Sequence, residues 1–193
     1  GPRYTITAQL PYDRPQTSMK VFPMCPDCLQ EYKDPLDRRF HAQPNACDVC
    51  GPHVELKDKT GAPVSCEDEI AELLRQIQGG KIAAVKGLGG FHLVCDAANA
   101  VAVSELRRRK HRPFKPFAVM TLNDLSASRF VRISEKASKE LHSPQAPIVL
   151  CPKTNDADRL LPGIAPELNR IGIMMPYTPI HWLLFFEAIG RPE

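Results

Sequence analysis

Four cysteines form the clearest chemical pattern in this sequence. They occur as two Cys-x-x-Cys pairs separated by eighteen residues: Cys25 with Cys28, and Cys47 with Cys50. Each pair directs two thiolates towards one point, and two such pairs on a folded-back loop complete the tetrahedral four-sulfur set that zinc accepts. Protein thiolates then fill every position and leave none for a water nucleophile. The spacing therefore predicts one structural zinc ion per chain.

Other uses of these cysteines explain the pattern less well. A redox Cys-x-x-Cys motif needs only one pair beside a helix, and an iron–sulfur centre is a minor alternative. His41 and His53 flank the pairs and could act as ligands, but four thiols already suffice. The remaining cysteines lack a partner at ligand spacing, and we expect them to be small buried apolar residues: Cys66, Cys95 and Cys151.

A second pattern is a run of positive charge over residues 105–115, which holds six basic residues and one acidic residue. The whole chain carries a formal charge of +3, so the rest of it is net acidic. Lys110, Arg112 and Lys115 lie on a proline-stiffened loop that leads into an expected strand, which holds them near a sheet edge. Guanidinium and ammonium groups together suit phosphate binding. We interpret residues 107–109, which precede this loop, as a solvated helical face.

A glycine-rich turn, residues 86–92, lies between two expected strands and reads Lys-Gly-Leu-Gly-Gly-Phe-His. Glycines let the backbone approach a ligand closely, and free amides there can bind phosphate or carbonyl oxygens. The turn is neither a P-loop nor a dinucleotide fingerprint, because no Gly-Lys-Thr/Ser follows and no helix begins at the glycines. Taken alone, it is equally consistent with a plain tight turn.

Strands and helices alternate around these patterns. Ile70, Leu73, Leu74 and Ile77 follow the helical spacing i, i+3, i+4, i+7 after a short acidic run, and two glycines end that helix. The alternation predicts an α/β (α+β) fold with a twisted, mixed sheet and flanking helices. We expect strands at 82–85, 91–95, 117–122, 147–150 and 171–175, and further helices at 97–110, 124–130, 134–142 and 179–189.

The chain divides by composition into four segments. Its opening Gly-Pro-Arg, followed by Tyr-Thr-Ile, repeats the Gly-Pro-His exit after Cys50, so we expect it to begin just after an earlier four-cysteine module; a cloning remnant is the alternative. The closing Gly-Arg-Pro-Glu normally leads into another strand, which predicts that the domain continues. The segments are an irregular lead (1–19), a zinc module (20–56), a linker (57–66) and the first part of an α/β domain (67–193).

Composition limits the class of protein. With 193 residues, 43% of them hydrophobic and 24% charged, the chain is typical of a folded globular protein and not of a disordered one. No segment approaches the roughly 18 apolar residues of a membrane span, and the beginning of the chain lacks a signal-peptide pattern. We therefore expect a cytoplasmic protein that has no membrane partner.

Three segments resemble the hydrogenase maturation carbamoyltransferases known as HypF. Residues 22–53 resemble the second four-cysteine zinc module of that family, and residues 86–97 and 106–120 resemble the start of its YrdC-like domain. The resemblance covers essentially the whole chain. It implies an enzyme that hydrolyses carbamoyl phosphate and joins the carbamate to ATP as carbamoyl-adenylate. The carbamoyl group then passes to the C-terminal cysteine of the partner HypE, and becomes cyanide for the [NiFe]-hydrogenase site.

The resemblance also implies roles for single residues. The four paired cysteines become zinc ligands. Lys110 and Arg112 match the Lys-x-Arg motif that contacts the phosphates of ATP, which is bound with Mg2+, and Lys115 is a further phosphate contact of less certain register. The glycine-rich turn would line the acyl-adenylate pocket through Lys86, Gly89, Gly90 and His92.

Several domains and one motif of the family do not occur in this chain. The acylphosphatase-like domain, the first zinc module, the Ser-x-Asn nucleotide motif and the transferase domain are absent, so we expect no carbamoylation by the chain alone. An alternative is a YrdC-type module that binds RNA, such as double-stranded RNA, or nucleotides beside a structural zinc. The charge pattern disfavours nucleic acid, because the rest of the chain is net acidic and only Phe114 and Phe117 accompany the cluster. For the zinc segment alone, a structural spacer is the simplest role.

Overall fold

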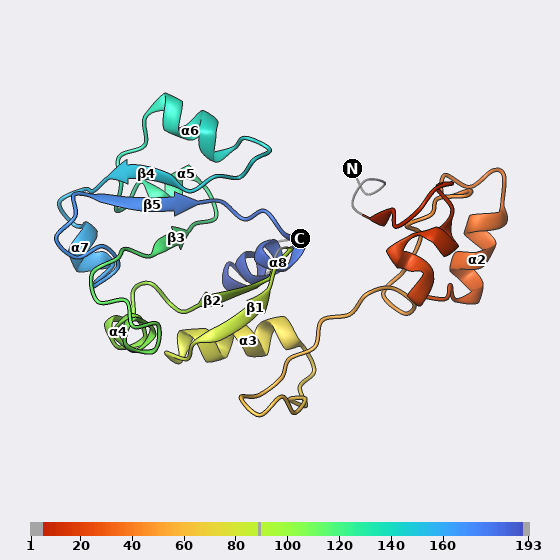
Figure 1. The fold of residues 1–193 in the computed structure, drawn as a ribbon, viewed down its shortest axis with the longest axis horizontal. Helices are drawn as coiled ribbons and strands as arrows, with labels where there is room; N and C mark the ends of the chain where they lie inside the picture. Colours follow the sequence, from red (N-terminus) through yellow and green to blue (C-terminus); the bar gives the residue numbers. More distant parts are fainter. Residues whose placement is uncertain (1–5, 89, 191–193) are drawn as a thin grey trace. The chain divides into compact units, whose positions relative to one another are not determined.

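The computed structural model of the chain describes residues 6–88 and 90–190, which form two compact units that meet in sequence between Pro63 and Val64 (Figure 1). This point falls inside segment 57–66, which we expected to be a linker. Each unit has its own secondary structure, and each is described separately below.

The smaller unit contains little regular structure. From residue 6 onwards, the short 3-10 helices η1 (Arg14–Gln16) and η2 (Ser18–Val21) precede the α-helix α2 (Pro26–Lys33). An isolated antiparallel bridge joins Thr7 to Thr17, whose side chain is fully buried. Prolines prevent a longer helix or strand in the lead, yet part of this segment is ordered and packed within the unit.

The larger unit begins with a helix and a hairpin. Helix α3 (Glu69–Gln78) starts at Asp68, whose carboxylate accepts the N–H groups of Ile70 and Ala71, each at 2.9 Å. Strands β1 (Ala83–Lys86) and β2 (Phe91–Val94) pair antiparallel and form a two-stranded sheet. The glycine-rich turn therefore joins two strands, as predicted.

A second sheet has three strands in the order β3-β5-β4. Strand β5 (Arg170–Met174) lies in the centre, parallel to β3 (Ala118–Met120) and antiparallel to β4 (Val149–Pro152). A Cβ at Gly172, in the central strand, would lie 2.8 Å from the side chain of Ile148, so a larger residue there would force that side chain to shift. The expectation of a mixed sheet is confirmed.

Helices flank the two sheets. They are α4 (Ala100–Arg109), α5 (Asp124–Ala127), α6 (Glu135–Leu141), α7 (Ala157–Leu160) and α8 (Pro179–Ala188). Figure 1 shows α6 beside β4, and the two elements are in contact. Helix α7 lay outside the predictions because four residues are too short for a helical period. Within the described ranges, no helix has the length and apolar character to cross a bilayer.

One apolar core holds the three-stranded sheet and its helices together. Cys151 belongs to this core and is 1% exposed, as expected for a small buried residue. Cys95 packs against the core from its edge, and burial raises the pKa of its thiol. The buried members are Val103, Val119, Ala127, Phe130, Val131, Leu141, Cys151, Ala157, Leu161, Ile164, Ala165, Ile171, Ile173 and Met175.

Candidate functional site

The four paired cysteine thiols meet at one point in the smaller unit. The Sγ atoms of Cys25, Cys28, Cys47 and Cys50 all lie within 4.8 Å of one another. Cys25 and Cys47 have their Sγ atoms 3.7 Å apart, and the Sγ atoms of the second pair are 3.8 Å apart. Tetrahedral zinc with Zn–S distances of about 2.3 Å places its sulfurs about 3.8 Å apart, whereas a disulfide needs about 2.0 Å. The donor set and its spacing fit a structural zinc ion.

Local backbone geometry forms the two turns that present the thiols. Cys25 lies just before α2, and its carbonyl accepts the N–H of Leu29 at 2.9 Å. After the second pair, the N–H of Gly51 donates to the carbonyl of Cys47 at 2.7 Å. A Cβ at Gly51 would lie 2.6 Å from that oxygen, so only glycine fits here without a backbone shift.

Arg14 of the lead segment (residues 1–19) is buried, at 8% exposed, and its hydrogen bonds connect this segment to the loop between the cysteine pairs. Its guanidinium donates to the carbonyl oxygens of Gln43 at 2.8 Å, Asn45 at 2.7 Å and Phe22 at 2.7 Å. Asn45 in turn donates from its side-chain amide to the carbonyl of Cys28 at 2.9 Å. The loop between the cysteine pairs is therefore held from both sides by polar side chains.

The metal-free thiols titrate differently from one another. Hydrogen bonds from the backbone of Cys25 and Cys47 lower the pKa of Cys50 to about 6, which favours its thiolate at neutral pH. Burial raises the pKa of Cys28, and its thiol neighbours add to that effect. Zinc must therefore displace a proton from Cys28, while Cys50 is already prepared to bind the ion.

A cavity of about 940 Å3 lies in the larger unit. Its walls come from α3, β2, the end of α4, β3 and α8, and most lining side chains are apolar. An apolar pocket with a few convergent polar groups is the usual form of a small-molecule site. Those polar and charged side chains are His92, Asp96, Lys110, Arg112, Gln145, Tyr177 and His181.

The basic loop brings two of its three predicted phosphate contacts to this cavity. Lys110 and Arg112 both line it, but Lys115 does not and its side chain is exposed. The guanidinium of Arg112 donates from Nη2 to the carbonyl of Pro116 at 2.7 Å and lies 5.3 Å from the ring centre of Phe117. These contacts fix the direction of Arg112 and leave Nη1 without a partner among the described residues.

Arg107 departs from its prediction. We interpreted residues 107–109 as a solvated helical face, and this is wrong for Arg107, whose guanidinium lies 4.7 Å from the ring centre of Phe117 and bonds the backbone of two loops. Arg108 and Arg109 are exposed and pair with Glu105. The carbonyl acceptors of Arg107 are Gly163 at 2.7 Å, Arg112 at 2.8 Å, Pro113 at 3.1 Å, Lys115 at 3.0 Å and Ile164 at 2.9 Å.

We expect Arg107→Ala to destabilise the larger unit by about 2–3 kcal/mol, because hydrogen bonds from a charged donor are lost and several carbonyls lose their partner. Arg108→Ala is the matched control, since an exposed ion pair on one helix contributes little. Urea unfolding of both variants measures the difference. Equal stability of the two variants would contradict the role of Arg107 in holding the loop.

The glycine-rich turn contributes one predicted residue to the cavity. His92 lines it, whereas the ammonium of Lys86 lies 5.0 Å from the ring centre of Phe91 and does not. Gly90 has a φ of 147°, which side chains rarely adopt, and its carbonyl accepts the N–H of Gly87 at 2.7 Å. Gly89 lies outside the described residues.

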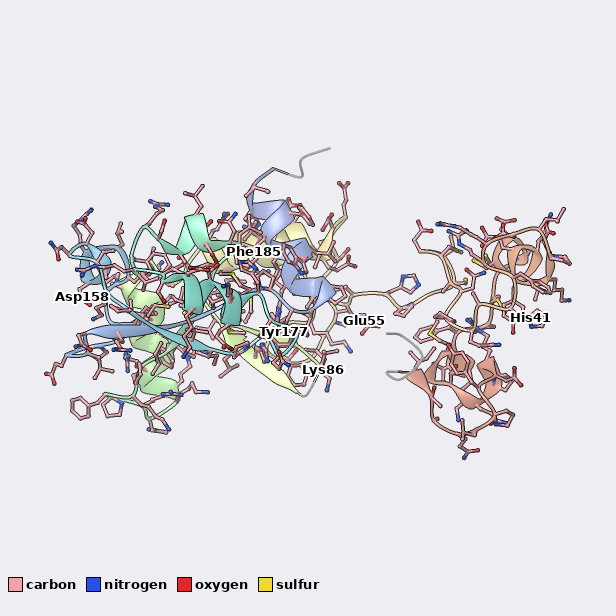
Figure 2. The ribbon with its side chains drawn as sticks, turned by 90° about the horizontal axis from the view of Figure 1, so that it is seen from above. His41, Glu55, Lys86, Asp158, Tyr177 and Phe185 are labelled. Carbon is pink, nitrogen blue, oxygen red and sulfur yellow. The ribbon has the colours of Figure 1, made fainter. Side chains whose placement is uncertain are left out.

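Four polar residues that line the cavity were not predicted: Asp96, Gln145, Tyr177 (labelled in Figure 2) and His181. Tyr177 and His181 lie between β5 and the first turn of α8, and the Tyr177 hydroxyl is 3.0 Å from Nε2 of His92. A signal did exist in the sequence: polar residues directly follow a buried strand, and a histidine occurs in an otherwise apolar helix. Nothing in their spacing connects them to His92, which lies 85 residues before Tyr177.

Comparisons with known proteins match both units to families. The family Sua5_yciO_yrdC, described as "Telomere recombination", matches residues 75–192. The chain belongs to this family. The family zf-HYPF, described as "HypF finger", matches residues 24–57 and contains all four clustered cysteines. This match and the thiol geometry together support the structural zinc.

Curated relatives match this chain over nearly its whole length. Carbamoyltransferase HypF of Rhodobacter capsulatus is 50% identical over 98% of this chain and 25% of that protein. Carbamoyltransferase HypF2 of Cupriavidus necator is 52% identical over 100% of this chain and 24% of that protein. The resemblance to HypF is thus confirmed, and the chain spans about a quarter of the length of these curated relatives.

A solved structure agrees with the fold. "Crystal structure of full-length HypF in the phosphate- and nucleotide-bound form" superposes with a TM-score of 0.80 and 46% sequence identity, and covers 97% of this chain and 24% of that one. The expected fold class, a zinc module followed by an α/β domain of the YrdC-like type, is confirmed. The curated relatives that the chain matches are named carbamoyltransferases.

Proposed function

We propose that this chain carries the structural zinc and part of the nucleotide site of a carbamoyltransferase that forms carbamoyl-adenylate. Hydrolysis of carbamoyl phosphate by water releases phosphate and carbamate. A carbamate oxygen then attacks the α-phosphorus of MgATP. The bond from that phosphorus to the bridging oxygen breaks, and pyrophosphate leaves. The carbamoyl group then passes from the adenylate to the C-terminal cysteine thiol of HypE, with AMP as the leaving group, in the cytoplasm.

The observation that carries this proposal is the convergence of Lys110 and Arg112 on one apolar cavity. Carbamate and ATP are both anions, so positive groups must offset phosphate charge before the two can approach. The guanidinium of Arg112 and the ammonium of Lys110, which both line the cavity, meet that need. A relative solved in a "phosphate- and nucleotide-bound form" supports a nucleotide ligand for this family.

The apolar walls serve the same reaction. Carbamate and its adenylate decompose quickly in water, and a cavity lined mostly by apolar side chains limits the access of water to them. His92 on β2 lines the same cavity and is held there by its hydrogen bond to Tyr177. The zinc, in the separate smaller unit, takes no part in this chemistry because all its positions are filled by thiolates.

The decisive experiment is the exchange of radioactive pyrophosphate into ATP, with carbamoyl phosphate as the second substrate. We expect exchange by the full-length enzyme that contains this chain, and none by the 193-residue chain alone. Exchange is expected to depend on carbamoyl phosphate. A full-length enzyme that hydrolyses carbamoyl phosphate and still shows no exchange would contradict the adenylate intermediate.

An RNA-binding module is the second candidate, favoured by the membership of residues 75–192 in the Sua5_yciO_yrdC family. The arrangement of the arginines supports it poorly, because Arg107 bonds backbone carbonyls and Arg108 and Arg109 pair with Glu105. Few cations of the basic run 105–115 are then left to bind nucleic-acid phosphates and release their counterions. Tight tRNA binding that weakens steeply with salt would favour this second function.

A further inference from the structure

One buried imidazole in the cavity has no apparent role in the fold. His181, in the first turn of α8, is 2% exposed, and neither of its ring nitrogens has a hydrogen-bond partner among the described residues. Leaving a buried polar group without a partner destabilises the folded state. Leucine or phenylalanine would fill the same space without that cost, so packing alone does not account for histidine here.

The surroundings of His181 hold its ring in one orientation. Its ring stacks on His92, with ring centres 5.5 Å apart and planes inclined by 24°, and meets Tyr177 edge-on at 4.9 Å. Its backbone N–H donates to the hydroxyl oxygen of Thr178 at 3.4 Å, which caps the helix. We call these three rings the His92–Tyr177–His181 cluster. All three line the cavity.

The cluster is itself held from β2 and from the segment after β5. The Tyr177 hydroxyl and Nε2 of His92 are 3.0 Å apart and form a hydrogen bond, which satisfies both groups. A Cβ at Gly87 would lie only 3.4 Å from that same nitrogen, so the glycine-rich turn leaves room for the ring of His92. Two members of the cluster thus bond each other, whereas the ring nitrogens of His181 bond none of the residues that the structure describes.

The charge state of the His181 ring indicates which chemical groups it can bind in the cavity. Burial lowers the pKa of its imidazole, and the neighbouring His92 lowers it further. A neutral imidazole offers one N–H donor and one nitrogen acceptor. It therefore suits a small planar group that itself has both a donor and an acceptor, and it contributes no positive charge for binding a phosphate.

We propose that His181 binds the carbamoyl group in the cavity by hydrogen bonding, and that Tyr177 and His92 position its ring. The carbamoyl group is planar and carries an NH2 donor beside a carbonyl acceptor, which complements either tautomer of the ring. Lys110 and Arg112 serve the phosphates, so the charged and the neutral polar groups of the cavity divide the substrate between them. This assignment rests on the proposed function and names the residue that selects the carbamoyl group.

The test uses three variants of the full-length enzyme in the pyrophosphate exchange assay. His181→Leu introduces an apolar side chain of similar size and removes both ring nitrogens. We expect its KM for carbamoyl phosphate to rise roughly tenfold or more, as for one lost hydrogen bond. The KM for ATP and the rate of carbamoyl phosphate hydrolysis are expected to stay within about twofold. His181→Asn, which retains a donor and an acceptor, is expected to recover part of the loss. Tyr177→Phe, which frees His92, is expected to raise the same KM by a smaller factor.

His142→Leu is the matched control, because His142 is exposed, pairs with Asp124 and does not line the cavity. An unchanged KM for carbamoyl phosphate in His181→Leu would overturn the assignment. Parallel loss of ATP and carbamoyl phosphate binding in both His181→Leu and His181→Asn would also overturn it, since that outcome indicates a structural role. Absence of exchange in the unmodified enzyme would instead reject the proposed function, and this assignment with it.

Discussion

Removal of zinc is expected to unfold the smaller unit and leave the larger one folded. Four thiols are the only group of metal-type donors that meet at one point in the described residues. In the described part of the unit, the short helix α2 and a few buried apolar side chains are all that could replace them. Binding of zinc by such a site contributes about 10–16 kcal/mol of apparent free energy, which is comparable to the usual stability of a whole domain. Cys28→Ser, which replaces the most buried ligand, should have the same effect as a chelator.

Metal analysis and hydrogen exchange measure this result. We expect one zinc per chain, and loss of amide protection over residues 24–57 after chelation, with protection of β3, β4 and β5 retained. Cys66→Ser is the matched control, because Cys66 lies outside the cluster. Protected amides over residues 24–57 in a metal-free chain would refute a structural role for the metal.

The pH dependence of zinc binding has a defined sign. Zinc binds thiolates, and protons compete for the same sulfurs, so acidification must weaken binding. Burial raises the pKa of Cys28 in the metal-free site, so zinc must displace a proton from this thiol even at neutral pH. The pKa of Cys50 is about 6, so protons compete with zinc for this sulfur only as the pH falls towards that value. The smaller unit is therefore expected to lose its metal, and then its fold, in acid.

The second large effect is expected for Arg112→Ala in the full-length enzyme. Loss of this guanidinium should lower carbamoyl-phosphate-dependent pyrophosphate exchange by about 10²–10³-fold, which is the usual cost of removing one fixed donor to transition-state charge. Hydrolysis of carbamoyl phosphate should be spared, because the proposal gives Arg112 no part in that step. The two rates are measured on the same enzyme preparation.

Arg108→Ala is the control for this substitution, since Arg108 belongs to the same basic run, pairs with Glu105 and does not line the cavity. Both variants lose one positive charge, so a general effect of charge would lower their exchange rates equally. Equal loss of exchange and of hydrolysis in Arg112→Ala would remove Arg112 from the adenylation site.

Most secondary structure of the larger unit could be predicted from local pattern. The apolar period of residues 70–77 and the acidic residues before it predict α3, and glycines between two short apolar runs predict the β1–β2 hairpin. These signals are local because helix and strand periods repeat within a few residues. The smaller unit was harder to predict, since metal ligation and the carbonyl contacts of Arg14 replace regular structure there.

The sequence by itself determined the metal chemistry, because four thiols at Cys-x-x-Cys spacing meet almost wherever the intervening loop folds back. It also predicted Lys110 and Arg112, two residues apart in the sequence, as phosphate contacts, and both line the cavity. Only the tertiary structure decided that Arg107 bonds backbone rather than water, and that His181 meets His92. The carbonyl acceptors and ring contacts of these residues come from segments far apart in the chain. No local period records such contacts, because they depend on how the two sheets and α8 pack around the cavity.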